Sequence, residues 1–268
     1  RHGVALQHFT VHLGRRPEPD WSPLAAEGAR VLQATRHQRK LPRGALAGNR
    51  FRIVLRAVAG DVDAARARLA AIAADGVPNY FGEQRFGRGG GNVEAARAMF
   101  GGRRVDRAQR SILLSAARSQ LYNQVLARRV LDGSWNQAVE GDVFQLDGRG
   151  SVFGPEPLDE VLRRRVAAGE IHPTGPLWGA GALRSAAAVA ELEAGVVAAE
   201  PELATGLVAA GLGQERRALR LRVQALGVDW PVAGQLALAF ELPAGTYATV
   251  VLRELARLAE EHGTGGGR

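Results

Sequence analysis

The sequence contains no cysteine, and Lys40 is its one lysine among 35 basic residues. Without cysteine there are no disulfide bonds, no thiol catalysis and no zinc sites of the cysteine type. No apolar run approaches the length of a membrane span, so we expect no membrane partner. The histidines His8 and His12 have no acidic residue close to them in the sequence, so we do not interpret them as metal ligands. These absences fit a cytoplasmic protein that holds no metal.

The first residues also lack two familiar features. The chain opens on Arg1-His2-Gly3, without an initiator methionine and without the pattern of a secretory signal peptide. We therefore expect the natural protein to begin upstream of Arg1.

Positive charge is in excess and is clustered. The chain has 35 basic and 27 acidic residues, a formal net charge of +8. Residues 30–56 contain eight basic side chains and no acidic one: Arg30, Arg36, Arg39, Lys40, Arg43, Arg50, Arg52 and Arg56. Arginine offers planar forked donors to phosphates, so the cluster favours a polyanionic partner such as nucleic acid. A solvated surface loop is the alternative interpretation.

Two further residues in this cluster favour nucleic acid. Asn49 carries an amide that can orient or read a base, and Phe51 carries a ring on which a base can stack. Both lie in or next to an alternating segment, Phe51-Arg-Ile-Val-Leu-Arg56, which is typical of a strand.

Strand-like patterns near both ends flank a largely helical middle, which predicts an α+β fold with a discontinuous sheet domain. Strands are predicted at 5–13, 31–35, 51–57, 216–223 and 235–242, and helices at 61–76, 92–100, 106–131 and 247–261. Asp147-Gly148 predicts a hairpin turn, and the stretch 171–181 a rigid Pro/Gly loop. Asn92 and Thr246 are predicted helix N-caps.

Five motifs stand in order along the chain. They are Arg36-x-x-Arg-Lys-Leu-x-x-Gly-x-Leu-x-Gly-Asn-x-Phe51, Gly76-Val-Pro-Asn-Tyr-Phe-Gly-x-Gln-Arg-Phe-Gly87, Ser115-Ala-Ala-Arg-Ser-x-Leu-Tyr-Asn123, Gly175-Pro-Leu-Trp-Gly179 and Phe240-Glu-Leu-Pro-Ala-Gly-Thr-Tyr-Ala-Thr-x-x-Leu-Arg-Glu254. With them the chain resembles the D family of tRNA pseudouridine synthases (TruD), nearly from end to end.

The resemblance implies a fold and an activity. The fold is a mixed or antiparallel pseudouridine synthase sheet with helices, interrupted by an inserted α/β domain. It implies a catalytic domain in two parts, 1–75 and 223–262, around an insertion at 76–222. The implied reaction is isomerisation of a uridine of tRNA, uridine 13 in the D-arm region, without metal or organic cofactor.

The resemblance also implies substrate-binding residues. Phe51 would stack on the target uracil and Asn49 would brace the catalytic loop. Tyr247 matches an aromatic position that faces the substrate, although it could instead be a core residue that starts a helix. The remaining tRNA-binding residues are basic: Arg1, Arg39, Lys40 and Arg43.

The nucleophile is expected outside this sequence. In the family, an aspartate in a Gly-x-Lys-Asp-Arg segment attacks the uridine, and Arg1-His2-Gly3 matches the residues after that aspartate. The aspartate would stand immediately before Arg1, so we expect the chain as given to bind tRNA weakly and convert no uridine. A non-catalytic RNA-binding protein on the same scaffold is the alternative function.

Overall fold

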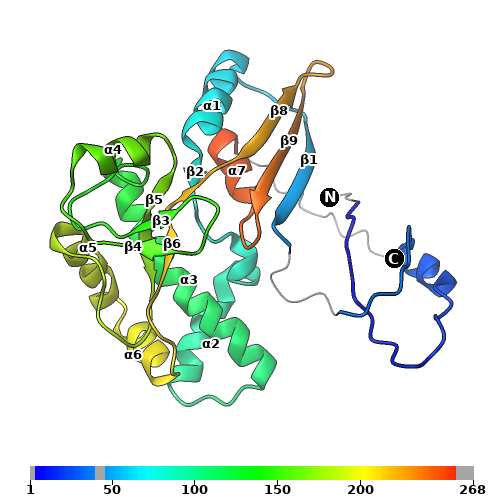
Figure 1. The fold of residues 1–268 in the computed structure, drawn as a ribbon, viewed down its shortest axis with the longest axis horizontal. Coiled ribbons are helices and arrows are strands. Elements are labelled where there is room, and N and C mark those ends of the chain that lie inside the picture. The colour runs from blue at the N-terminus through cyan, green and yellow to red at the C-terminus, as the bar shows by residue number, and fades with distance from the viewer. Residues whose placement is uncertain (1–3, 40–45, 258–268) are drawn as a thin grey trace, which may run out of the picture. The chain divides into compact units, whose positions relative to one another are not determined.

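The structure is a computed structural model that describes residues 4–39 and 46–257. The chain forms two compact units, residues 1–47 and 48–268, and each is described by itself. Figure 1 colours the chain from blue at the N-terminus to red at the C-terminus.

The first unit contains one short 3-10 helix, η1 (Ser22–Glu27), which ends at Gly28 in the left-handed conformation. The strands predicted at 5–13 and 31–35 are wrong, because residues 4–39 form no strand. A strand is stable when a neighbouring strand pairs with its N–H and C=O groups, and neither segment has such a neighbour here. The apolar side chains of Leu6 and Phe9 are consequently exposed, by 72% and 79%.

The second unit begins with a three-stranded antiparallel sheet. Its order is β1 (Gly48–Arg56), β9 (Gln235–Pro243) and β8 (Gln224–Asp229), so the predictions at 51–57 and 235–242 are confirmed. Helices α1 (Val62–Asp75) and α7 (Ala248–Leu255) cover one face of this sheet (Figure 1). The core between them contains Leu69 and Ile72 of α1, Val250 and Val251 of α7, and the buried residues Leu236, Leu238, Phe240 and Leu242 of β9.

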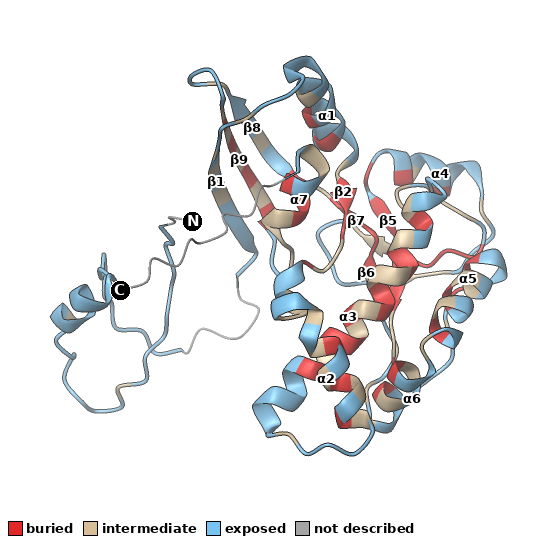
Figure 2. Ribbon diagram, turned by 180° about the vertical axis from the view of Figure 1, so that it is seen from behind, coloured by how far each residue is buried: buried red, intermediate tan, exposed pale blue. Residues whose placement is uncertain are grey.

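A short two-stranded connection links this part to the middle of the chain. The chain leaves through β2 (Val77–Pro78) and returns through β7 (Arg220–Leu221), which pair antiparallel. Figure 2 shows β2 and β7 between the three-stranded sheet and the remaining elements. We call this pair the neck.

Beyond the neck lies a four-stranded sheet in the order β4-β3-β5-β6. Its strands are β3 (Phe144–Leu146), β4 (Val152–Phe153), β5 (Ile171–Leu177) and β6 (Glu215–Ala218). The predicted hairpin is β3–β4 and is confirmed. The predicted rigid loop is wrong for 171–177, which form the inner strand β5. Pro173 lacks an N–H, but its carbonyl still accepts from the Leu219 N–H at 2.8 Å.

Helices surround this sheet. They are α2 (Gly91–Phe100), α3 (Arg107–Leu131), α4 (Glu160–Ala167), α5 (Ala187–Ala198) and α6 (Pro201–Ala209), with the 3-10 turns η2 (Glu83–Arg85) and η3 (Arg88–Gly90) before α2. The long helix α3 follows the prediction closely. The Asp106 side chain caps it by accepting from the Gln109 N–H at 2.8 Å.

The two predicted caps at Asn92 and Thr246 are wrong. Helix α2 begins after Gly90, and the Asn92 amide donates to the Arg85 carbonyl at 3.3 Å. The Thr246 hydroxyl donates to the Pro243 carbonyl at 2.7 Å, and α7 begins after Tyr247. In both cases the polar side chain bonds to a carbonyl of the preceding element, which competes with capping.

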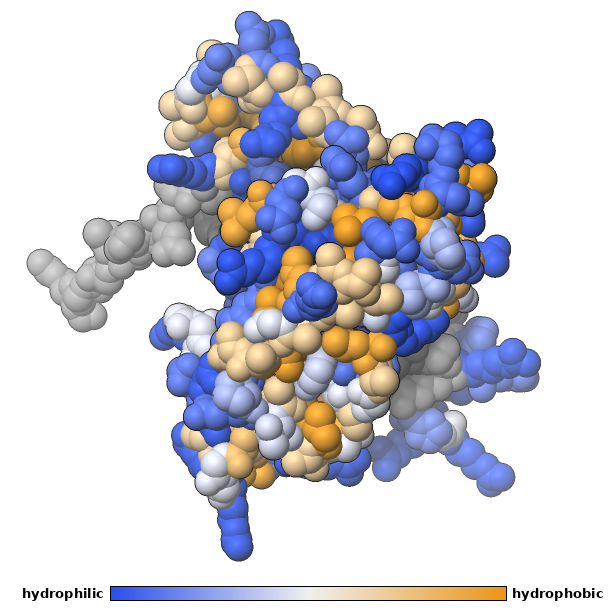
Figure 3. Space-filling view, turned by 90° about the vertical axis from the view of Figure 1, so that its left-hand side faces the viewer, coloured by the Kyte–Doolittle hydropathy of each residue, from blue (hydrophilic) through white to orange (hydrophobic). Residues whose placement is uncertain are grey.

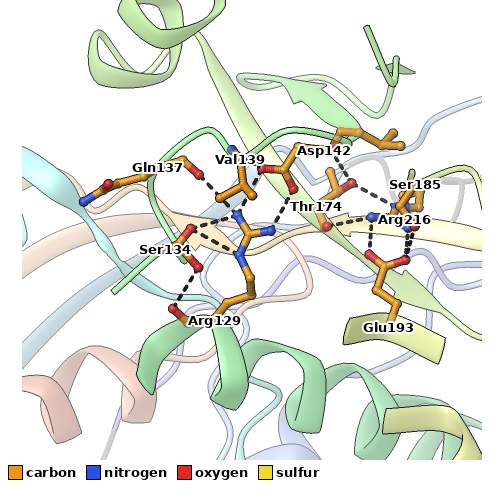
Figure 4. A network of polar contacts seen from close by, with 10 residues as sticks. Arg129, Ser134, Gln137, Val139, Asp142, Thr174, Ser185, Glu193 and Arg216 are labelled. Atoms are coloured by element: carbon orange, nitrogen blue, oxygen red, sulfur yellow. Dashed lines mark hydrogen bonds and ion pairs between the residues drawn. The ribbon is translucent and has the colours of Figure 1, made fainter. Parts of the chain in front are cut away.

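Buried ion pairs hold the region beyond the neck together (Figure 4). Arg129 on α3 pairs with Asp142 at 2.8 Å, and Arg216 on β6 pairs with Glu193 on α5 at 2.7 Å. All four side chains are at most 3% exposed. In the segment 216–223, which was predicted as a strand, the Arg216 side chain thus points into the fold.

The described structure is an α+β protein, as predicted, and its named strands all pair antiparallel. Among the described residues, no helix has the length and hydropathy needed to cross a membrane. On the face seen in Figure 3, hydrophobic residues occur in small groups between hydrophilic ones, as is usual for a surface in water.

Candidate functional site

Three predicted site residues from distant parts of the sequence lie at one end of the three-stranded sheet. Asn49 and Phe51 stand near the start of β1, where Asn49 pairs with Leu242 at the end of β9. The chain then turns at 243–246 and reaches Tyr247. Phe51 and Tyr247 both pack against the same core cluster. The strand register therefore brings the three together.

The side chains of β1 divide between two faces. Asn49 and Phe51 share one face, and the Phe51 ring is half-buried with its centroid 5.5 Å from that of Phe240. Arg50 and Arg52 point to the other face, where Arg50 pairs with Glu241 at 2.6 Å. The Phe51 ring thus packs against the ring of Phe240, its paired residue on the neighbouring strand β9.

The basic residues predicted for tRNA binding are placed in part. Arg39 belongs to the first unit, where it is exposed and its backbone N–H donates to His37 Nδ1 at 3.0 Å. Arg1, Lys40 and Arg43 lie outside the described residues.

The second motif surrounds Tyr247. Arg85 donates from Nε to the Tyr247 hydroxyl at 3.1 Å and from Nη1 to the Ser115 hydroxyl on α3 at 2.7 Å. The Tyr247 ring meets Phe81 edge-on, with centroids 6.4 Å apart. Gly82 lies against the same ring, because an added Cβ there would come within 3.1 Å of it. Residues of this segment therefore contact both the hydroxyl and the ring of Tyr247.

The third motif binds the same segment from the other side. The Asn123 amide accepts from the Phe81 N–H at 2.9 Å and donates to the Phe81 carbonyl at 3.0 Å. Tyr122 meets the Phe81 ring edge-on at 5.3 Å and donates its hydroxyl to the Ala218 carbonyl at 2.6 Å. Burial raises the pKa of Tyr122, so this hydroxyl stays protonated and remains a donor.

Arg217 on β6 completes the arrangement, and sequence reasoning missed it. Its guanidinium lies 4.2 Å from the Phe81 ring centroid and donates to Asn79 Oδ1 at 2.7 Å. It also donates to the Gly245 carbonyl at 3.3 Å, in the turn before Tyr247. The signal in the sequence was the alternation of basic and apolar residues over 216–223, which predicted a strand but not the partners of Arg217.

The fourth motif contributes close packing. A Cβ on Gly175 would lie 3.0 Å from the Leu219 side chain and 3.3 Å from the Tyr122 ring, so a larger residue would displace Tyr122. We call the assembled group the joint: Asn79, Phe81, Arg85, Ser115, Tyr122, Asn123, Arg217 and Tyr247.

The aromatic rings and guanidinium groups of the joint contact one another and hold Tyr247 and the turn before it in place. None of its eight residues is acidic, so the joint itself supplies no carboxylate nucleophile. Within the described ranges, His, Asp and Glu side chains form no cluster of three that could hold a metal ion.

Comparison with known proteins identifies the family of the chain. The family described as tRNA pseudouridine synthase D (TruD) matches residues 1–102 and 94–255. A protein named tRNA pseudouridine synthase D from Xanthomonas campestris pv. campestris (strain B100) is 55% identical over 270 residues, covering 95% of this chain and 74% of the relative. One of the same name from Methylococcus capsulatus is 51% identical over 257 residues, covering 95% and 73%.

A solved structure shows the same fold. The putative tRNA pseudouridine synthase D from Methanosarcina mazei matches with a TM-score of 0.60 at 22% identity, covering 83% of this chain and 72% of that one. The identities above 50% and the near-complete match of the family establish membership. The chain belongs to the tRNA pseudouridine synthase D family.

Proposed function

We propose that this protein isomerises a uridine of tRNA to pseudouridine, at position 13 in the D-arm region. The observation that carries the proposal is that Asn49, Phe51 and Tyr247 all lie at one end of the sheet. The names of the relatives support the substrate and the reaction.

The neck supports a division of the chain into a catalytic domain and an insertion. In our proposal, residues 1–75 and 223–262 form the catalytic domain and 76–222 the insertion. The paired strands β2 and β7 let the chain leave and return at adjacent points.

The reaction is an isomerisation and balances without a cofactor. A carboxylate attacks C1′ of the ribose or C6 of the base, and the bond between N1 and C1′ breaks. The base turns over, C5 forms a new bond to C1′, and the bond between the carboxylate and the substrate breaks, which frees the carboxylate again. The proton lost from C5 is balanced by one gained at N1. We propose that this carboxylate is the aspartate of the segment expected before Arg1.

The residues of the site would bind and orient the base. A target uridine must leave its stack, and the half-buried Phe51 ring, fixed against Phe240, is suited to receive it. Asn49 is exposed on the same face, and we propose that it braces the catalytic loop. Tyr247 presents a second aromatic ring whose hydroxyl Arg85 holds. Arg1, Arg39, Lys40 and Arg43 are proposed to bind the tRNA backbone.

The test uses the protein that includes the upstream segment, incubated with an unmodified tRNA transcript. Pseudouridine formation is expected at position 13, detected by chemical labelling and primer extension. Phe51→Ala should lower kcat strongly while tRNA affinity changes little. Phe51→Leu is the matched control for lost volume, and it should stay nearly as impaired, because stacking needs a ring.

Two results would contradict the proposal. If Phe51→Ala lowers tRNA affinity and the parent protein converts no uridine, the protein is a non-catalytic RNA binder. Pseudouridine formation by residues 1–268 alone would contradict the placement of the nucleophile before Arg1.

A further inference from the structure

Four exposed arginines lie where α2 ends and α3 begins. Arg103 and Arg104 are in the loop between the helices, and Arg107 and Arg110 are in the first turns of α3. Within the described ranges, none of the four side chains has an ion pair or hydrogen bond. We call this group the basic corner; in Figure 2 its loop is the pale blue segment at the lower edge.

Nearby carboxylates do not neutralise the basic corner. Residues 95–131 contain eight arginines and one acidic residue, Asp106, whose side chain already caps α3. Three of the other arginines are used within the fold, since Arg97 pairs with Glu200, Arg118 with Glu215 and Arg129 with Asp142. Four like charges held together on a surface repel one another and attract a polyanion.

Helix α3 leads from the basic corner to the joint. Arg107, Ser111 and Ser115 follow at intervals of four residues and so lie along one ridge of the helix. Ser115 accepts from Arg85, which holds Tyr247. The eight residues from Arg107 to Ser115 rise about 12 Å along the helix axis. A nucleic-acid strand places a few phosphates along such a length.

We propose that the basic corner binds the sugar-phosphate backbone of tRNA, a few nucleotides from the uridine that reaches Tyr247. The inference rests on the proposed function, and it assigns the corner a share of the affinity and none of the chemistry. Arginine without a protein partner is free to form forked hydrogen bonds with phosphate oxygens. The tRNA backbone then runs along the ridge of α3 from Arg107 to Ser115.

The experiment measures tRNA affinity of the protein with its upstream segment between 50 and 200 mM salt. The variants are R103A/R104A and R107A/R110A, and the matched control is R163A/R164A on α4. The control removes the same charge from exposed arginines elsewhere beyond the neck. Each lost phosphate contact lowers the slope of log K against log salt by about 0.7 to 0.9, so a corner variant should lose about 1.4 to 1.8. The slope of the control variant should fall by less than half of that amount.

Activity provides the second readout. With the unmodified transcript, corner variants should lose about 10-fold in kcat/KM and keep kcat at saturating tRNA, because the corner binds backbone alone. Thermal unfolding checks that the variants are folded, as expected for exposed arginines.

The outcomes separate the two proposals. If the parent protein converts uridine and the corner variants match the control in slope, the basic corner is not a tRNA contact. If the corner binds polyglutamate as tightly as tRNA, its partner is an acidic protein surface and the proposal is wrong. If the parent protein converts no uridine, the proposed function fails by itself.

Discussion

The arginines of β6 and β7 and those of the basic corner show two uses of one residue type. Arg216 and Arg220 are buried, and the partners of each are fixed protein groups. Arg103 and Arg107 are exposed and have no such partner among the described residues. A buried guanidinium must recover its lost hydration through several hydrogen bonds, whereas an exposed one keeps its hydration and its field. The first group therefore stabilises the fold, and the second is available to a ligand.

The largest effect is expected where a buried charge loses its partner. Glu193→Gln leaves Arg216 buried without a carboxylate, and the free energy of unfolding should fall by about 3 to 5 kcal/mol. Urea unfolding measures it. The double variant Glu193→Leu/Arg216→Met removes both charges and should recover most of the loss. If the double variant is as unstable as the single one, packing outweighs charge at this site.

A smaller effect is expected at the half-buried Arg85. Its bond to the Tyr247 hydroxyl should appear in a double-mutant cycle of Arg85→Met and Tyr247→Phe as a coupling of about 0.5 to 3 kcal/mol in unfolding free energy. Arg85→Met with Ser115→Ala is the companion cycle, because Ser115 shares the guanidinium. A coupling of zero in both cycles would show that Arg85 does not hold the joint.

The buried Arg220 makes stability depend on pH through His172. Arg220 donates from Nε to His172 Nδ1 at 2.9 Å, so Nδ1 is unprotonated and Nε2 donates to Asp147 at 2.7 Å. Burial lowers the pKa of His172, and the positive charges of Arg220 and Arg222 act in the same direction, against the carboxylate of Asp147.

The folded protein binds a proton at His172 less readily than the unfolded chain does. The contribution of neutral His172 to the free energy of unfolding is therefore present above a pH of about 6.5 and is lost as the pH falls below it. Between pH 8 and 5.5, the free energy of unfolding should fall by about 1 kcal/mol more in the wild type than in His172→Gln. This difference is about the contribution of one hydrogen bond. Glutamine can accept from Arg220 and donate to Asp147 without titrating. Equal pH profiles for the two proteins would contradict this assignment.

The smallest effect is expected at the surface pair of Arg50 and Glu241. These side chains are 76% and 38% exposed, so Arg50→Ala should cost less than about 1 kcal/mol. Screening should remove most of this cost in 1 M salt. A cost above 2 kcal/mol would mean that exposure does not separate the two uses of arginine.

Local signals in the sequence predicted much of the fold. The helices α1 and α3 follow from apolar periodicity, and the hairpin follows from Asp147-Gly148. The strand β5 was missed because Pro173 and Pro176 suggested a loop, while its pairing depends on carbonyls that proline retains. The strands predicted at 5–13 and 31–35 do not form. An alternating pattern does not show whether another strand is present to pair with the segment.

The candidate site was predictable from the sequence only in part. Asn49, Phe51 and Tyr247 stand in recognisable motifs, so their residues could be named although their meeting depends on the register of β1 and β9. Arg217 could not be identified, because its contact with Phe81 and Gly245 joins segments that are distant in the chain. Alternation shows that its side chain leaves one face of a strand but not whether that face is covered.

The neck makes the region beyond it modular. Val77 and Leu221 are paired neighbours in β2 and β7, and antiparallel partners have Cα atoms about 4.5 to 5.5 Å apart. A turn of a few residues could therefore replace everything between them and leave the three-stranded sheet and α1 continuous. The same proximity means that the excised segment would have adjoining ends, so it could be inserted between two neighbouring residues of another protein.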